Sequence, residues 1–147
     1  MIMKPKSSLW LVVFLCLIVI LSFEGFCQNS SATSAAPPSK TLTLDQAVMC
    51  EAIKDLVPQN PAVVFSITVG KVLCYTSFDP VPEKTFIYHK WYHKDKLSTK
   101  KRLSLTPPRW ATFTSLLLRE TDKGPWRVEI YDQKGKLFQT LRFSITD

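Results

Sequence analysis

Apolar and polar residues alternate along most of the chain beyond residue 60, which is the pattern of half-buried β-strands. Turn-forming residues interrupt the alternation about every ten residues. Strands are therefore predicted over residues 62–69, 72–77, 85–93, 100–106, 109–118, 126–131 and 137–145. This arrangement predicts a mainly β fold, an antiparallel β-sandwich of about six or seven strands.

The phase of the alternation predicts which side chains face the core. Trp126, Val128 and Ile130 share one face of their strand, opposite Arg127 and its neighbours Glu129 and Tyr131. On the segment 109–118, the shared face carries Trp110, Thr112, Thr114, Leu116 and Leu118. Gly70 with Lys71 predicts a two-residue turn between the first two strands, or alternatively a bulge in one longer strand.

Residues 44–56 have two interpretations. Thr43 with Gln46 forms a capping-box pattern, and Val48, Ala52 and Leu56 recur at helical spacing, which favours a short N-terminal helix. The same segment also alternates as a short strand. The prolines at 58 and 61 end the element in either case.

The N-terminus has the pattern of a targeting segment. Lys4 and Lys6 precede an unbroken apolar run of 13 residues, from Leu9 to Leu21, which is short for a membrane span and typical of a signal peptide. We predict a signal peptide over residues 1–27, or alternatively an uncleaved signal anchor. Residues 28–41 form a Ser/Ala/Pro linker that we expect to be disordered, followed by one domain over residues 42–147.

Two of the four cysteines, Cys50 and Cys74, lie in the predicted domain. Because cysteines of exported domains usually pair, a Cys50–Cys74 disulfide is predicted, with two buried free thiols as the alternative. A redox site is not expected, since the C-x-x-C spacing is absent from the sequence.

Five short motifs occur in order along the second half of the chain: His89–Trp91, Arg109–Trp110, Lys123–Glu129, Asp132–Gly135 and Leu141–Phe143. Together they resemble a bacterial family called domain of unknown function 2914. The resemblance extends from about Val48 to the C-terminus. It implies an exported or membrane-tethered protein with an immunoglobulin-like sandwich, and it makes the segment around Cys50 an edge strand. It implies no activity and no catalytic residues.

The run Thr85–His93 is rich in aromatic residues and contains both histidines of the protein. His89 and His93 share one face of a strand with Trp91, but two imidazoles do not complete a tetrahedral metal site, and none is predicted. Structural roles are predicted for His89, Trp110 and Trp126, and for Glu129 as a candidate ion-pair partner of Arg127. Exposed tryptophans would instead provide a stacking platform for sugar rings.

Positive charge is concentrated in one predicted hairpin. Between Lys84 and Arg102 the chain has seven Lys or Arg residues against Asp95 alone, a net of +6, whereas the whole chain carries +7. Such a patch attracts anions at long range, although lysines also protect edge strands from aggregation. The candidate binding residues are Lys90, Trp91, His93, Lys94, Lys96, Lys100, Lys101, Arg102 and Arg109.

The sequence predicts a non-catalytic binding or assembly module. The hydrolase, zinc-protease and phosphate-loop motifs are all absent from the sequence, so no enzyme activity and no cofactor are expected. The expected location is outside the cytoplasm, in the periplasm, with an inner-membrane tether if the signal is not cleaved. The expected partner is an anionic envelope polymer, a lipid surface or another envelope protein, rather than nucleic acid. Carbohydrate recognition through exposed tryptophans is the alternative.

Overall fold

Short and long β-strands make up most of the computed structural model, which describes residues 41–147. Within that range there are ten strands, two 3₁₀ turns and no α-helix: β1 (Leu44–Cys50), β2 (Ala52–Lys54), β3 (Val57–Gln59), β4 (Val64–Ser66), η1 (Ile67–Val69), β5 (Lys71–Phe78), β6 (Thr85–His93), β7 (Lys96–Leu105), β8 (Trp110–Leu117), η2 (Glu120–Asp122), β9 (Gly124–Asp132) and β10 (Leu137–Thr146). In residues 41–147 no helix is long and apolar enough to span a membrane.

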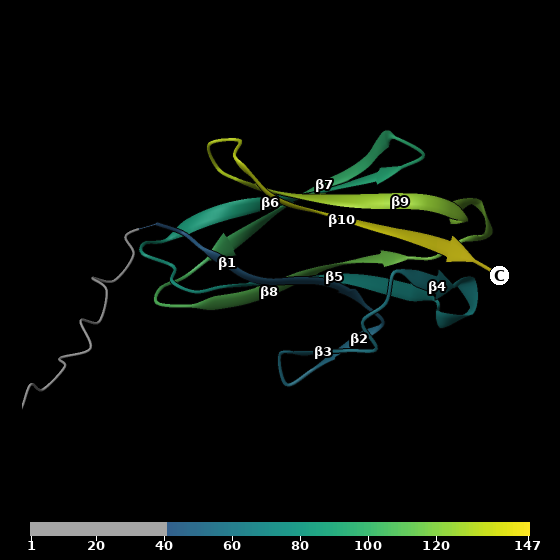
Figure 1. The fold of residues 1–147 in the computed structure, drawn as a ribbon, viewed down its shortest axis with the longest axis horizontal. Helices are drawn as coiled ribbons and strands as arrows, with labels where there is room; N and C mark the ends of the chain where they lie inside the picture. The colour runs from purple at the N-terminus through teal and green to yellow at the C-terminus, as the bar shows by residue number, and fades with distance from the viewer. Residues whose placement is uncertain (1–40) are drawn as a thin grey trace, which may run out of the picture. The chain divides into compact units, whose positions relative to one another are not determined.

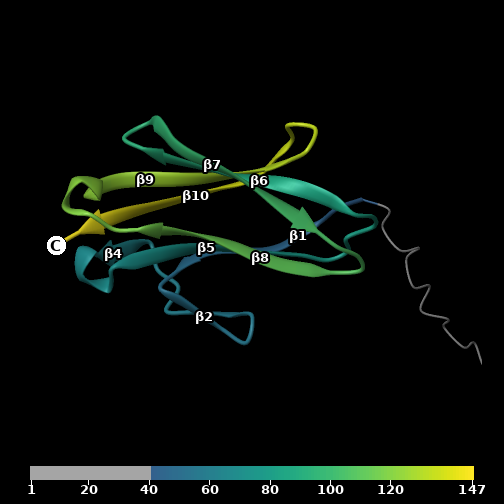
Figure 2. The same ribbon diagram turned by 180° about the vertical axis from the view of Figure 1, so that it is seen from behind.

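The strands form two facing sheets and a small ribbon (Figure 1). One sheet has the order β1-β5-β8, and the other has the order β4-β10-β9-β6-β7. Figure 2 shows the β2–β3 ribbon beneath the three-stranded sheet, on the side away from the five-stranded one. Neighbouring strands are antiparallel except for β4 and β10, which are parallel. The predicted mainly β sandwich is confirmed, and seven of the ten described strands are seven residues or longer.

The core lies between the sheets because inward residues recur with a period of two on each strand. Trp91 from β6 and Trp126 from β9 pack with Phe143 of β10, and Val72 and Cys74 reach the same cluster from β5. Trp91 is fully buried, and its ring meets Phe143 edge-on at 6.0 Å between centroids. These indoles supply much of the apolar area that holds the two sheets together.

The helical interpretation of residues 44–56 is wrong. Residues 44–50 form β1, which pairs antiparallel with β5, and Met49 and Cys50 are both buried there on opposite faces. The remainder of the segment forms β2 and turns back through Asp55 and Leu56, both at positive φ. Pairing with β5 and burial on two faces therefore override a local helix preference worth only a few tenths of a kcal/mol per residue.

The predicted strand over residues 62–69 is mostly wrong as well. Only β4 is extended, and the chain then enters η1, whose first turn is capped by the hydroxyl of Ser66 and whose end is Gly70 at φ 73°. β4 pairs with β10, whereas β5 pairs with β1 and β8. The chain therefore crosses between sheets at Gly70, so neither the predicted hairpin turn nor the bulge is present.

The predicted disulfide is absent, and Cys50 and Cys74 are both buried free thiols. In the β1–β5 register Met49 lies opposite Cys74, and Cys50 lies opposite Leu73. Directly opposed residues share a face, so Cys74 points into the sandwich while Cys50 points to the outer side. The two sulfurs are on opposite faces of one sheet, which a disulfide cannot bridge without moving the backbone.

The predictions for the signal peptide or anchor over residues 1–27 and for nearly all of the linker over 28–41 lie outside the described residues. They remain predictions from the sequence.

Candidate functional site

The outer face of the five-stranded sheet carries the candidate site. On β6, Ile87, His89 and Trp91 are buried, so the alternate residues Phe86, Tyr88, Lys90 and Tyr92 face outward. The β6–β7 register places Ser104, Arg102 and Lys100 opposite the first three of these outward residues, on the same face. We call this surface the basic face, and it consists of Phe86, Tyr88, Lys90, Tyr92, Lys100, Arg102, Arg127, Glu129, Tyr131 and Arg142.

Four cations of the basic face lie over aromatic rings. Lys100 is 3.9 Å from the ring centroid of Tyr88, and Arg102 is 3.9 Å from that of Phe86. Lys90 lies over Tyr131 at 3.9 Å, and Arg127 lies over Tyr92 at 4.1 Å. At exposed sites such contacts contribute about 0.5–1 kcal/mol each. The rings therefore hold four positive charges in defined positions on one face.

Lys90 and Lys100 lie directly opposite each other on β6 and β7. Like charges in that position repel. Each lysine instead extends diagonally over a different ring. Lys90 lies over Tyr131 of β9, and Lys100 lies over Tyr88 of β6. The aromatic side chains thus allow a higher positive charge density than bare lysine pairs on a sheet would.

Glu129 is the only carboxylate of the basic face, and it lies among its partners. It accepts hydrogen bonds from Arg127 Nε at 2.9 Å and from the Tyr131 hydroxyl at 3.0 Å, and also bonds with Tyr92. Burial alone would raise the pKa of Glu129, but these donors hold it below the ordinary value. The side chain is 15% exposed. Glu129 is therefore an ionised acceptor that fixes the arginine and the two tyrosines, and the predicted pairing with Arg127 is present.

The other hairpin cations are spread around this face. Lys94 lies in the β6–β7 turn, and Lys96 pairs in register with His93. Lys101 lies opposite the buried His89, so it belongs to the inward side of the edge strand, where it is nevertheless exposed. Arg109 is not part of the basic face. Its guanidinium forms a 2.9 Å ion pair with Asp79 beside the three-stranded sheet.

Two of the predicted binding residues pack instead. Trp91 is fully buried and has no free ring face for a ligand, because its strand phase points it into the sandwich. His93 stacks on Trp126 at 4.4 Å between centroids, and its Nε2 lies 3.1 Å from the carbonyl oxygen of Lys123. These contacts attach the end of the β6–β7 hairpin to the start of β9.

The core assignment of Trp110 is wrong. Trp110 is 42% exposed at the first position of β8. It borders a groove of about 570 Å³ together with Leu56, Tyr75 and Arg109. Trp126 is buried, and its indole N–H donates to the carbonyl oxygen of Asp122 at 2.6 Å. Of the three tryptophans in residues 41–147, one is exposed, so they form no common platform.

His89 belongs to a buried polar network that joins the sheets. Its Nδ1 is 2.9 Å from the Thr114 hydroxyl and its Nε2 is 3.3 Å from the Thr76 hydroxyl. The indole N–H of Trp91 donates to the same Thr114 oxygen at 3.0 Å. Burial lowers the pKa of His89 to about 4, so the ring is neutral at neutral pH. Within residues 41–147 no group of three or more His, Cys, Asp or Glu side chains is arranged to hold a metal ion.

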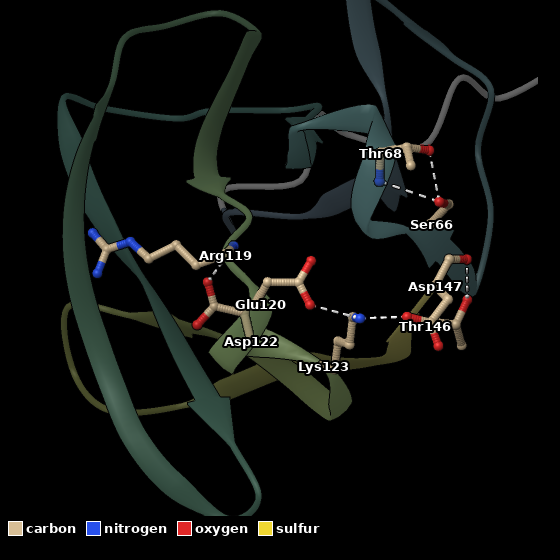
Figure 3. Close-up of polar contacts among 8 residues, drawn as sticks. All are labelled: Ser66, Thr68, Arg119, Glu120, Asp122, Lys123, Thr146 and Asp147. Carbon is tan, nitrogen blue, oxygen red and sulfur yellow. Dashed lines mark hydrogen bonds and ion pairs between the residues drawn. The ribbon is translucent and has the colours of Figure 1, made fainter.

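A second polar cluster lies where the β8–β9 connection meets the C-terminal residues (Figure 3). Lys123 pairs with Glu120 at 2.7 Å and also with Asp147. Asp122 accepts a 2.9 Å hydrogen bond from the backbone N–H of Arg119, whose side chain extends away from it. The lysine and its carboxylates satisfy one another, which indicates a role in fixing η2 rather than in binding a ligand.

Sequence reasoning missed the tyrosines and Arg142 as parts of the site. The alternation of Arg127, Glu129 and Tyr131 did predict that they face outward. However, no sequence pattern shows that β9 lies beside β6, or that Arg142 on β10 lies opposite Arg127. Only the sheet order brings these strands together.

Comparisons with known proteins give one family. No curated protein matches the chain. Among solved structures, the chain is similar to a β-glucosidase from Listeria innocua in complex with glucose, with 8% identity and a TM-score of 0.44. That alignment covers 73% of this chain and 16% of the enzyme chain. The family model matches residues 84–145, which include the whole basic face but not residues 48–83. The segment 84–145 therefore matches the family "Protein of unknown function (DUF2914)", and the predicted resemblance is confirmed over that range.

Proposed function

We propose that this protein is a non-catalytic binding module whose basic face attaches to an anionic polymer or lipid surface. The observation that carries the proposal is the set of four cations held over aromatic rings on one side of one sheet. A solvated lysine hairpin that only prevented aggregation would not need its charges fixed on that face. Preorganised charge reduces the entropy cost of binding.

The location of this activity rests on the N-terminal residues. The predicted signal peptide over residues 1–27 would bring the domain to the periplasm, where anionic lipid and envelope polymers are the available partners. A chain kept in the membrane by an uncleaved signal would present the same face close to lipid. Nucleic acid remains an unexpected partner under this proposal.

The experiment compares vesicles of phosphatidylglycerol and phosphatidylcholine with vesicles of phosphatidylcholine alone. Each basic residue near an anionic surface contributes about 1 kcal/mol. We therefore expect the double variant Lys100→Gln/Arg102→Gln to bind the anionic vesicles roughly 30-fold more weakly. Raising the salt concentration should weaken the wild type in the same way, because the attraction is screened.

The matched control is Lys54→Gln/Lys71→Gln, which removes the same charge from exposed positions on the side of the three-stranded sheet. It should bind like the wild type. Equal losses in both double variants would mean that only net charge matters, and the proposal for the basic face would then fail. Thermal unfolding of both variants checks that the fold is retained.

The carbohydrate alternative depended on exposed tryptophans. Trp91 and Trp126 are buried and Trp110 lies across the sandwich from the basic face, so no observation favours a tryptophan platform.

A further inference from the structure

A small hollow lies at the end of the basic face, beneath the β6–β7 turn. Its volume is about 110 Å³. It is lined by Tyr92, Lys94, Asp95, Pro125, Trp126, Arg127 and Arg142. Three of these residues are cations and one is a carboxylate, so the lining carries a net charge of +2. At about 30 Å³ per water, the hollow holds the equivalent of about four waters, which is enough for a tetrahedral oxyanion.

The two arginines of the hollow are directly opposite each other on β9 and β10. Like charges in that position destabilise a sheet unless something neutralises them. Arg127 has partners, since it pairs with Asp95 and Glu129 and lies over Tyr92. Arg142 is exposed, and within residues 41–147 it has neither an acidic partner nor a ring beneath it. The lysine pair on the same face, in contrast, has a ring for each member.

The third cation, Lys94, is positioned by the backbone of the turn. Lys94 and Asp95 have φ values of 45° and 65°, and the Lys94 N–H donates to the carbonyl oxygen of Pro125 at 3.1 Å. A Cβ on Gly124 would lie 3.2 Å from Lys94 Cε, so the glycine leaves the space along which the lysine side chain runs. Lys94 is therefore held at the edge of the hollow on the side of β9.

We propose that this hollow binds a phosphate group, with Arg142 and Lys94 as its direct contacts and Arg127 as its supporting charge. Guanidinium groups donate paired hydrogen bonds to phosphate oxygens, and an anionic group matches the positive charge of the lining. The inference rests on the proposed function, because it names the chemical group that the basic face recognises. The group would be either a lipid headgroup phosphate or free phosphate.

The first experiment uses inorganic phosphate with the full-length protein. Thermal unfolding is followed at constant ionic strength, with chloride replaced stepwise by phosphate, and binding is measured by calorimetry. The wild type should gain stability and bind phosphate. Arg142→Gln should weaken phosphate binding roughly tenfold or more, since hydrogen bonds to charged groups are the strong ones. Lys94→Gln should weaken it less.

The matched control is Arg102→Gln, which removes an arginine from the other end of the same face and should leave phosphate binding unchanged. Without phosphate, Arg142→Gln should unfold at the same or a slightly higher temperature than the wild type, since a repulsion is removed. Equal phosphate responses in the wild type and Arg142→Gln would overturn the proposal, as would no response in the wild type. Acetate binding as tightly as phosphate would overturn the assignment to a tetrahedral group.

The second experiment separates this inference from the proposed function. Phosphatidylglycerol vesicles are titrated with the wild type, Arg142→Gln and Lys100→Gln/Arg102→Gln. If Arg142→Gln weakens both phosphate and vesicle binding, the group is a lipid phosphate. If it weakens phosphate binding alone, the hollow is a site for free phosphate. If vesicle binding depends on Lys100 and Arg102 while phosphate shows no dependence on Arg142, this inference fails and the proposed function stands.

Discussion

The outer faces of the two sheets are opposite in character, although both alternate with the same period. The basic face of the five-stranded sheet has cations paired with rings. The outer side of the three-stranded sheet exposes apolar residues instead, with Phe113 46% and Leu117 68% exposed on β8, and is partly covered by the β2–β3 ribbon. Alternation fixes which side chains face outward, but only their identity decides what the face binds.

The edge strands differ in the same way. β7 ends the five-stranded sheet and carries four charged residues, Lys96, Lys100, Lys101 and Arg102. β8 ends the three-stranded sheet and has no charged residue along its eight positions. Lysines on an edge oppose strand addition by another chain, whereas an uncharged edge permits it. The β7 edge of the five-stranded sheet is therefore protected against pairing, and the β8 edge of the three-stranded sheet is open to it.

The largest effect on stability should come from His89, whose buried hydrogen bonds join the two sheets. The pKa of His89 is about 4 in the folded protein, below the ordinary value of 6.5, so the unfolded chain takes up a proton first as the pH falls. Stability is then complete above about pH 6.5 and decreases between 6.5 and 4, by about 3 kcal/mol in all. Urea unfolding at pH 7, 5.5 and 4.5 measures this loss.

The control for that prediction is the other histidine. His89→Gln should remove most of the pH dependence in this window, at a cost in stability at pH 7, while His93→Gln should retain it. A wild type whose unfolding free energy is constant from pH 7 to pH 5 would show that His89 is not the neutral buried group described above. The two sheets should unfold together, since the hydrogen bonds of His89 to Thr76 and Thr114 join them.

The next largest effect on stability should come from Glu129 in the basic face. Glu129→Gln keeps the shape of the side chain but removes the charge that Arg127 and the two tyrosines hold. Hydrogen bonds to charged groups are worth about 1.5–3 kcal/mol, so we expect the free energy of unfolding of this variant to be lower by about 2 kcal/mol. Glu120→Gln is the matched control, because Glu120 is 77% exposed and its ion pair with Lys123 should contribute little. Equal losses from the two substitutions would contradict the role given to Glu129.

The sequence predicted the sandwich because its longer strands alternate clearly, and the phase of Trp126, Val128 and Ile130 gave the inward face of β9. For residues 44–50 it favoured a helix over the strand alternative, because Thr43 and Gln46 imitate a helix start, whereas pairing with β5 makes the segment the edge strand that the family resemblance implied. Trp110 follows the inward phase of β8, yet it lies at the strand end, where phase no longer implies burial.

The candidate site was predicted only in part, for a similar reason. The charge of the hairpin can be counted from the sequence, so Lys90, Lys100 and Arg102 were found. The partners of these residues depend on register and sheet order. The ring of Tyr131 reaches Lys90 from β9. In the same way, Arg142 reaches the hollow from β10. Long-range pairing of this kind leaves no local pattern. The disulfide failed for the same cause, because spacing says nothing about which face each cysteine occupies.

A smaller effect tests whether the rings and cations of the basic face are coupled. A double-mutant cycle with Lys100→Met and Tyr88→Leu should give a coupling energy of about 0.5–1 kcal/mol in chemical unfolding. The cycle Lys134→Met with Tyr88→Leu is the control and should give none, since Lys134 lies in the β9–β10 turn. A coupling close to zero in both cycles would mean that the lysine only passes near the ring.

The smallest effect on stability should accompany a clear effect on association, at the edge strands β7 and β8 that distinguish the two sheets. Leu117→Glu places a charge at an exposed position of β8, opposite Lys71, and should change the unfolding free energy by no more than about 0.5 kcal/mol. It should nevertheless reduce heat-induced aggregation measured by light scattering, because the open edge becomes charged. Lys101→Thr on β7 should act in the opposite direction, since it removes a charge from the protected edge. If Leu117→Glu leaves aggregation unchanged while Lys101→Thr increases it, the chain associates through β7, and β8 is not the open edge.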